Sequence, residues 1–190
     1  MDITLVNIAS KTVYDGKTVN TLSTVGIYSL IACLENSKIS VDFREYFLDF
    51  EKSPSDELRE AEEFFKDSFE IIGIGCHSIH LPFAVKVAQG IKKLYPHKYI
   101  IFGGIHPSIV AKPLVEKIKE IDLVIVGEAE HNFTLVVKSL LGGKRDLSGI
   151  RGLVFRENGK IVETGPHDRI ADLNSLPIPA YKYLDLDRYV

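Results

Sequence analysis

The stretch of residues 71–107 constrains the fold more than any other part of the chain. Two short apolar runs, 71–76 and 99–102, enclose a segment whose apolar residues recur at helical spacing. Strands that are apolar on both faces are typical of a parallel sheet covered by helices, so the stretch predicts a βαβ unit. Ligands bind such sheets beyond the carboxyl ends of the strands. We therefore expect a binding edge where these two runs end.

Three further runs complete the predicted sheet, at residues 3–8, 39–43 and 123–126, and a helical pattern follows each of the five strands. This alternation predicts an α/β fold with a doubly wound, five-stranded parallel sheet of the Rossmann-like or flavodoxin-like kind. Right-handed crossovers favour the strand order 2-1-3-4-5. Residues 9–23 are expected to form a polar loop.

The pattern changes near residue 148. Two alternating segments flank Asn158-Gly159, which is the typical turn of a two-residue β-hairpin. The remaining residues are rich in proline and tyrosine and predict an extended tail. We therefore divide the chain into a sheet domain (1–147), a hairpin appendage (148–167) and a linker (168–190).

Composition limits the partners of this chain. The formal net charge is -3, and no basic run predicts contact with nucleic acid or with a membrane surface. The first predicted strand begins at residue 3, so we expect no signal peptide, and no apolar run approaches membrane-spanning length. The two cysteines, Cys33 and Cys76, have no close cysteine neighbour, which argues against a zinc site, an iron–sulfur site or a disulfide framework. We expect a cytoplasmic protein.

The candidate binding residues follow the ends of the predicted strands. Gly103-Gly104 would let the backbone approach a ligand closely, although glycines also mark simple turns. Glu128 and Glu130 could act as a carboxylate pair, or could simply favour the start of a helix. Ser10 begins the predicted loop and could hold a phosphate, without a glycine-rich fingerprint. The complete set is Ser10, Cys76, His77, Ser78, Gly103, Gly104, His106, Pro107, Gly127, Glu128 and Glu130.

Neither metal binding nor covalent catalysis is predicted from these residues. His77, His80 and His106 could form a metal trio, but no carboxylate has ligand spacing to them. Cys76 could be a nucleophile, but a cysteine at a strand end is more typical of an apolar filler. A glycine-opened edge with few charges suits a large, flat and partly apolar ligand.

Five stretches together resemble a known family, the N-terminal cobalamin-binding domain of cobalamin-dependent radical S-adenosylmethionine enzymes. They are residues 25–34, 72–84, 103–107, 127–130 and 173–180. The resemblance implies that the chain holds cobalamin at the carboxyl ends of the strands. It also implies that the loops after the third, fourth and fifth strands surround the nucleotide tail and the lower face of the corrin.

The resemblance implies a longer parent enzyme, in which this module serves a reaction such as methyl transfer. The family's barrel carries a Cys-x-x-x-Cys-x-x-Cys motif, which this sequence lacks. The 4Fe-4S cluster and S-adenosylmethionine are thus expected only in a C-terminal radical S-adenosylmethionine domain, and no catalytic residue is expected here. The Asp-x-His-x-x-Gly motif of classical cobalamin-binding methyltransferases is also absent, which predicts binding without a histidine ligand to cobalt. The alternatives are a flavodoxin-like domain that binds flavin or nucleotide, and a protein-interaction domain.

Overall fold

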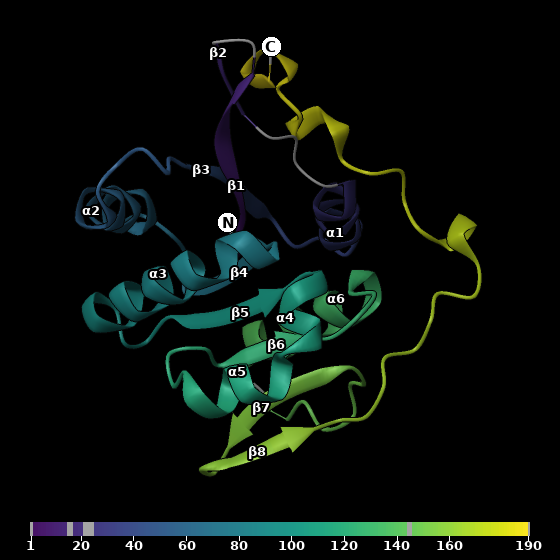
Figure 1. The fold of residues 1–190 in the computed structure, drawn as a ribbon. Helices are drawn as coiled ribbons and strands as arrows, with labels where there is room; N and C mark the ends of the chain where they lie inside the picture. Colours follow the sequence, from purple (N-terminus) through teal and green to yellow (C-terminus); the bar gives the residue numbers. More distant parts are fainter. Residues whose placement is uncertain (1, 15–16, 21–24, 144–145, 190) are drawn as a thin grey trace.

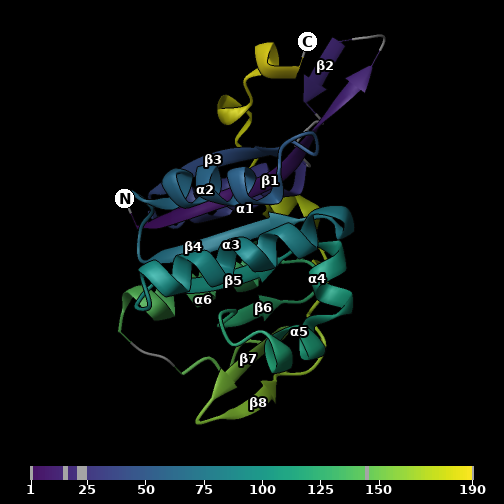
Figure 2. The ribbon, with the colours of Figure 1, turned by 60° about the vertical axis from the view of Figure 1, so that its left-hand side comes forward.

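A mostly parallel sheet runs through the molecule, with helices on both of its faces (Figures 1 and 2). The computed structural model describes residues 2–14, 17–20, 25–143 and 146–189. Five neighbouring strands are parallel in the order β3-β1-β4-β5-β6, which confirms the predicted order 2-1-3-4-5. They are β1 (Ile3–Tyr14), β3 (Val41–Leu48), β4 (Ile71–Cys76), β5 (Tyr99–Gly103) and β6 (Leu123–Ile125).

The sheet is larger than the five strands predicted. The hairpin consists of β7 (Leu153–Glu157) and β8 (Lys160–Glu163), and β7 pairs antiparallel with β6, so both strands extend the main sheet. Asn158 and Gly159 have φ angles of 49° and 77°, the positive values that an Asn-Gly hairpin turn requires. The hairpin and its turn are therefore confirmed.

The prediction of a polar loop over residues 9–23 is wrong for its first part. Strand β1 continues to Tyr14, pairing with β3 as far as Ser10 and then antiparallel with β2 (Lys17–Asn20). Backbone groups that pair in this way allow polar residues to remain in a strand. Ser10 consequently lies inside β1, buried and opposite Leu48 of β3. Residues 15–16 and 21–24 of the predicted loop lie outside the described ranges.

Two separate cores lie on the two faces of the sheet. Helices α1 (Val25–Asn36) and α6 (Glu130–Leu141) cover one face. Helices α2 (Pro54–Phe65), α3 (Leu81–Leu94) and α5 (Ala111–Lys117) cover the other, and Figure 2 shows α2 and α3 in front of the sheet. None of the helices in the described ranges has the length and apolar character that a membrane span requires.

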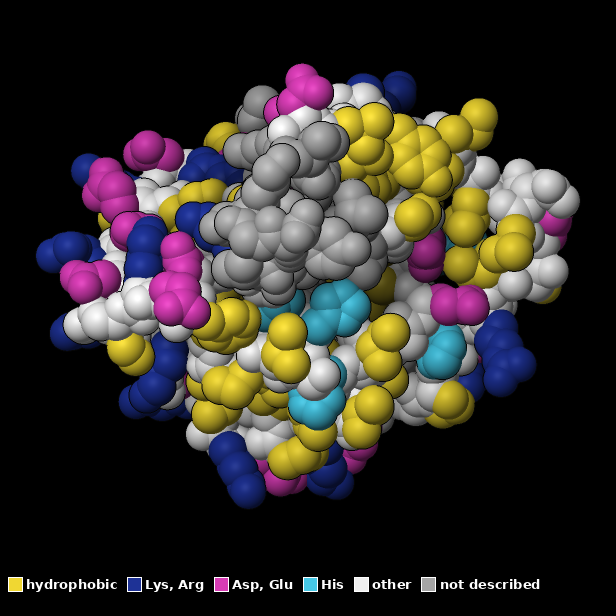
Figure 3. All heavy atoms as spheres, turned by 45° about the horizontal axis from the view of Figure 1, so that its top comes forward, with side chains coloured by type: hydrophobic (Ala, Val, Ile, Leu, Met, Phe, Trp, Pro, Cys, Tyr) yellow, Lys and Arg dark blue, Asp and Glu magenta, His cyan; other side chains and the backbone are white. Residues whose placement is uncertain are grey.

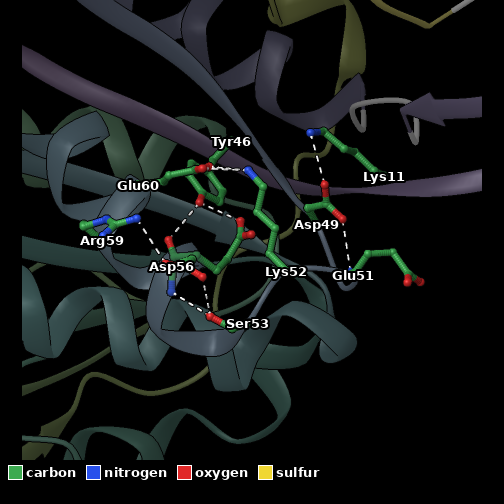
Figure 4. Close-up of polar contacts among 10 residues, drawn as sticks. Lys11, Tyr46, Asp49, Glu51, Lys52, Ser53, Asp56, Arg59 and Glu60 are labelled. Carbon is green, nitrogen blue, oxygen red and sulfur yellow. Dashed lines mark hydrogen bonds and ion pairs between the residues drawn. The ribbon is translucent and has the colours of Figure 1, made fainter.

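Helix α2 begins after Ser53, which caps its first turn. The Oγ atom of Ser53 accepts a hydrogen bond from the backbone N–H of Asp56 at 3.2 Å (Figure 4). Pro54 occupies the first turn of the helix. Lys52 and Glu60 form an ion pair at 2.6 Å beside this turn. Two further short elements at the carboxyl edge were not predicted, the 3₁₀ turn η1 (Ser78–His80) and helix α4 (Ile105–Ile109).

The tail passes from β8 along one side of the molecule and ends near β2 (Figure 1). It contains three 3₁₀ turns, η2 (Leu173–Ser175), η3 (Tyr181–Tyr183) and η4 (Leu186–Tyr189). The backbone N–H of Ala180 donates to the carbonyl of Tyr28 at 3.0 Å, and the hydroxyl of Tyr183 donates to Glu35 at 2.8 Å. The tail therefore lies on α1.

Candidate functional site

A cavity of about 710 Å³ opens at the carboxyl edge of the sheet, on the face that α1 and α6 cover. Its walls come from the strand ends, from α1, from α4 and from the loop that leads into α6. The sheet contributes Leu5, Asn7, Gly73–Cys76, Ile101–Gly103 and Ile125, and α1 contributes Gly26, Ile27 and Leu30. The cavity thus lies where the strands of a doubly wound sheet present their ligand-binding edge.

Glycines on one face of β4 and β5 line this space. Alternate residues of a strand point to opposite faces, and Gly73 and Gly75 point toward α1 and α6. A Cβ atom at Gly73 would lie 2.8 Å from Leu5, and one at Gly75 would lie 3.4 Å from Ile27. Gly103 pairs with Gly75, and a Cβ atom there would meet no heavy atom within 4 Å. Position 103 therefore faces open space within the cavity wall.

The fold itself requires a glycine at position 104. Its φ angle is 114°, a conformation that L side chains rarely adopt, and a Cβ atom would lie 2.8 Å from the carbonyl oxygen of Cys76. The sequence led us to expect that Gly104 leaves room for a ligand. The structure shows that the neighbouring backbone already requires a glycine at this position.

Ser108 connects two loops at the mouth of the cavity. Its hydroxyl donates to the carbonyl of Gly104 at 2.7 Å and accepts a hydrogen bond from the N–H of Gly127 at 3.1 Å. These bonds fix the loop after β5 relative to the loop after β6. Sequence reasoning missed Ser108, because α4 was not predicted and the serine falls just beyond Pro107.

The structure brings together seven of the eleven predicted site residues. Those that line the cavity are Cys76, His77, Gly103, Gly104, Gly127, Glu128 and Glu130. The four that do not line it are Ser10, Ser78, His106 and Pro107. Ser10 is buried within β1 and Pro107 is buried within α4, whereas Ser78 is exposed on η1 and His106 is half-buried.

The two glutamates at the cavity have different surroundings. The Oε2 atom of Glu128 accepts a hydrogen bond from the backbone N–H of Ile170 at 2.8 Å, so this carboxylate positions the start of the tail. Glu130 is the first residue of α6, where a negative charge favours the helix dipole. This arrangement supports a backbone-positioning role for Glu128.

The environments of Cys76 and His80 do not favour chemistry at either side chain. Burial raises the pKa of the Cys76 thiol to about 12, so the group stays protonated near neutral pH and packs in the core beneath α3. His80 is buried, and burial lowers its pKa below the ordinary value. Among the described residues, no group of three or more His, Cys, Asp or Glu side chains could hold a metal ion.

The rim of the cavity is apolar and exposed. Ile79 on η1 is 64% exposed, and Ile105 and Ile109 on α4 are each 74% exposed. Figure 3 shows this side of the molecule, where hydrophobic and histidine side chains gather. Clustered exposed apolar side chains mark binding surfaces more often than scattered ones do. The edge therefore offers an apolar surface beside an apolar cavity.

His167 completes the wall on the β6 side, and sequence reasoning missed it entirely. The residue lines the cavity although it lies in the segment after the hairpin, far along the chain from the predicted strand ends. Its ring packs against Gly127. No local sequence pattern indicated this contact, because it depends on how the tail folds back over the loop after β6.

Comparison with known proteins gives a match over most of the chain. The family described as "B12 binding domain" matches residues 11–137. An uncharacterised methyltransferase of Pyrococcus horikoshii is 32% identical over 120 residues, which are 63% of this chain and 26% of that protein. An anaerobic magnesium-protoporphyrin IX monomethyl ester cyclase of Synechocystis is 27% identical over 115 residues, 60% of this chain and 22% of that protein. The chain thus spans about a quarter of the length of these relatives.

Solved structures share the fold. The cobalamin-dependent S-adenosylmethionine radical enzyme OxsB, with aqua-cobalamin and S-adenosylmethionine bound, superposes with a TM-score of 0.65 at 14% identity. The superposition covers 96% of this chain and 24% of OxsB. A second OxsB structure, with aqua-cobalamin alone, gives the same values. Nearly all of this chain therefore matches the fold of part of a larger protein.

Proposed function

The chain belongs to the B12-binding domain family, and from this premise we propose that the nucleotide tail of cobalamin enters the cavity between α1 and α6. The observation that carries this proposal is the row of glycines Gly73, Gly75 and Gly103 on one face of two neighbouring strands. The tail ends in a flat aromatic base, and a flat base needs an apolar slot with little side-chain bulk. The cavity has these properties.

The corrin ring is proposed to lie over the apolar rim. Ile105 and Ile109 line the cavity and are exposed, as is Ile79 on η1, which contacts α4. A large flat macrocycle over these side chains would remove them from water. Each square ångström of apolar surface that is buried contributes about 25 cal/mol. The rim would thus supply free energy for binding the corrin, while the cavity would fix the orientation of cobalamin by holding its nucleotide tail.

The parent protein is proposed to be a cobalamin-dependent radical S-adenosylmethionine enzyme that transfers methyl groups. Support comes from the methyltransferase relative and from OxsB, of which this chain covers about a quarter. In this proposal the 4Fe-4S cluster and S-adenosylmethionine belong to a C-terminal domain of the same longer chain. Bound cobalamin supplies a cobalt centre that can carry a methyl group, and the residues described here bind and orient it.

The proposal includes binding without a histidine ligand to cobalt. His80 is buried beside β1 and is not part of the cavity wall, whereas His77 lines the wall and is exposed. We expect the base-off form of cobalamin, in which the benzimidazole has left the cobalt. The variants His77→Ala and His80→Ala should retain the spectrum of that form.

A spectroscopic titration tests the proposal. Hydroxocobalamin added at micromolar concentration should show the base-off shift in its visible spectrum, whereas FMN added in parallel should not bind. Tight FMN binding without cobalamin binding would support the flavodoxin-like alternative instead. Loss of the shift in His77→Ala would show that this histidine is a cobalt ligand.

A further inference from the structure

We propose that His167 is a further cofactor-binding residue, whose imidazole hydrogen-bonds a polar group of the nucleotide tail. The inference rests on the proposed function and adds a residue from outside the matched part of the chain, which ends at residue 137. It starts from one observation. The segment after the hairpin folds back over the end of β6 and places a histidine in the cavity wall.

Two glycines leave the space that His167 occupies. A Cβ atom at Gly127 would lie 2.3 Å from Nδ1 of His167, and a Cβ atom at Gly152 would lie 2.7 Å from the Cβ of His167. Both glycines have positive φ angles, 81° and 74°. They lie on different loops, one after β6 and one before β7. Gly127 therefore makes room for the imidazole of His167, and Gly152 makes room for the Cα and Cβ atoms of the same residue.

The segment that carries His167 is held on both sides of it. The Nε atom of Arg151 donates to the carbonyl of Pro166 at 3.0 Å and lies 3.3 Å from the carboxylate of Asp168. The N–H of Ile170 donates to Glu128 at 2.8 Å. Because the residues before and after His167 are bonded in this way, the ring is pre-positioned, which lowers the entropic cost of binding.

The imidazole of His167 is available to bind a ligand, because the polar groups near it are bonded elsewhere. Ser108 and Glu128, two polar neighbours in the cavity wall, are already bonded to backbone groups. Within the described part of the chain, the imidazole of His167 makes no hydrogen bond. The nucleotide tail contains a ribose and a phosphodiester, and these groups lose water on entering an apolar cavity unless a partner is present. A neutral imidazole offers one donor and one acceptor.

Cobinamide makes the test specific, because it has the corrin but lacks the nucleotide tail. We would measure dissociation constants of hydroxocobalamin and of aquacobinamide for the wild type and for three variants by visible spectroscopy. His167→Leu keeps the bulk of the ring, His167→Gln keeps a hydrogen-bonding group, and Arg169→Gln changes an exposed neighbour on the same segment. Melting curves would show whether each variant is folded.

The expected result is a loss of cobalamin affinity in His167→Leu of roughly 3- to 10-fold, which is typical of one lost hydrogen bond. His167→Gln should lose less, Arg169→Gln should bind like the wild type, and cobinamide should bind all four proteins equally. Wild-type cobalamin affinity in His167→Leu would overturn the inference. An equal loss for cobalamin and cobinamide would also overturn it, because the contact would not involve the tail. If the wild type bound no cobalamin, the proposed function would fail first, and the inference with it.

Discussion

The two faces of the sheet differ sharply at the ends of the same strands. On the side of α1 and α6, Gly73, Gly75 and Gly103 leave a cavity. On the side of α2 and α3, the same strands carry Ile74, Cys76 and Phe102, which are buried in the core. On that face the ring of Tyr46 on β3 also stacks on that of Phe83 on α3, with centroids 5.5 Å apart. One face is open and the other is closed, although both are built on β4 and β5.

The filled face is also closed by a buried polar pair. The hydroxyl of Tyr46 donates to Oε1 of Glu57 at 2.6 Å, and both residues are almost completely buried. Burial, followed by the hydrogen bond to Glu57, raises the pKa of Tyr46 above its ordinary value, so the hydroxyl remains a donor. Figure 4 shows Tyr46 beside the polar contacts at the start of α2.

The comparison shows how one strand can serve two purposes. The period of two residues sends alternate residues of β4 to opposite faces, so a Gly-x-Gly pattern removes bulk from only one of them. A buried Val or Leu side chain stabilises a fold by about 1.5–3 kcal/mol. At Gly73 and Gly75 the side chains of Leu5, Phe133 and Ile27 occupy the space beyond the glycine, whereas at Gly103 that space is open. The open face forgoes a buried side chain at Gly103, and the gain is a space that a ligand can fill.

Filling the open face should have the largest effect on binding. Gly103→Val would project a side chain into the cavity from a position where an added Cβ atom meets no heavy atom within 4 Å, and valine suits a strand. We expect a loss of cobalamin affinity of about 100-fold, comparable with the ~3 kcal/mol cost of overpacking a site. Unfolding free energy should change by less than about 0.5 kcal/mol. Titration and urea unfolding measure the two quantities.

The matched control for this variant is Gly149→Val. Gly149 is exposed, lies outside the cavity wall, and likewise has no heavy atom within 4 Å of an added Cβ. It should bind cobalamin like the wild type. Gly104→Val is a poorer probe, because the carbonyl of Cys76 and the positive φ would strain the fold in any case. Normal binding by folded Gly103→Val would refute the assignment of the open face.

Removing the buried hydrogen bond on the filled face should lower the stability of the fold and leave cobalamin binding intact. Tyr46→Phe removes the donor that satisfies Glu57, whose other oxygen, Oε2, has no hydrogen-bond partner in the described structure. A buried acceptor that loses its partner costs about 1–3 kcal/mol. Urea unfolding should show this loss, while the cobalamin affinity of the folded variant stays within about twofold of wild type. A weaker affinity with unchanged stability would contradict the comparison.

Acid should weaken the fold through His80, at the start of α3. Burial lowers the pKa of His80, so the folded state keeps the ring neutral while the unfolded state takes up a proton near the ordinary value of 6.5. Stability is therefore fully present above that value and falls as the pH drops through the lowered pKa. In His80→Leu this part of the pH dependence should disappear. Unfolding curves recorded at several pH values would measure it, and the exposed His97 gives the control His97→Leu.

The smallest effect should come from Glu128→Gln. The glutamine carbonyl can still accept the hydrogen bond from Ile170, so the start of the tail stays in place. We expect cobalamin affinity within about threefold of wild type, since a neutral hydrogen bond differs from a charged one by about 1 kcal/mol or less. Isothermal titration calorimetry would measure it. A loss as large as that of Gly103→Val would mean that the carboxylate itself contacts the ligand.

The sequence predicted the sheet because its signal is local. Each parallel strand is a short apolar run, and the crossover rule then leaves few strand orders. The hairpin was predictable for the same reason, since asparagine and glycine are the residues that most readily adopt the positive φ angles seen at Asn158 and Gly159. The extension of β1 beyond Ile8 was not predictable, because its partner β2 pairs through backbone atoms that polar side chains do not reveal.

The candidate site was predictable only where it follows strand ends. Gly103, Gly127 and His77 satisfy that rule, and they line the cavity. Ser10 was included only because the first strand was predicted to end at residue 8, whereas β1 continues to Tyr14. His167 could not be found in this way, because its place in the wall depends on contacts with two distant glycines.

The position of cobalt tests the central claim most directly. A crystal of the cobalamin complex, measured at the cobalt absorption edge, would give one anomalous peak per bound cofactor. The open-face account predicts that the peak lies beyond the ends of β4 and β5, above the rim formed by Ile79, Ile105 and Ile109. It also predicts electron density for the nucleotide tail between α1 and α6. A peak on the side of α2 and α3, or a cavity without the tail, would contradict the account.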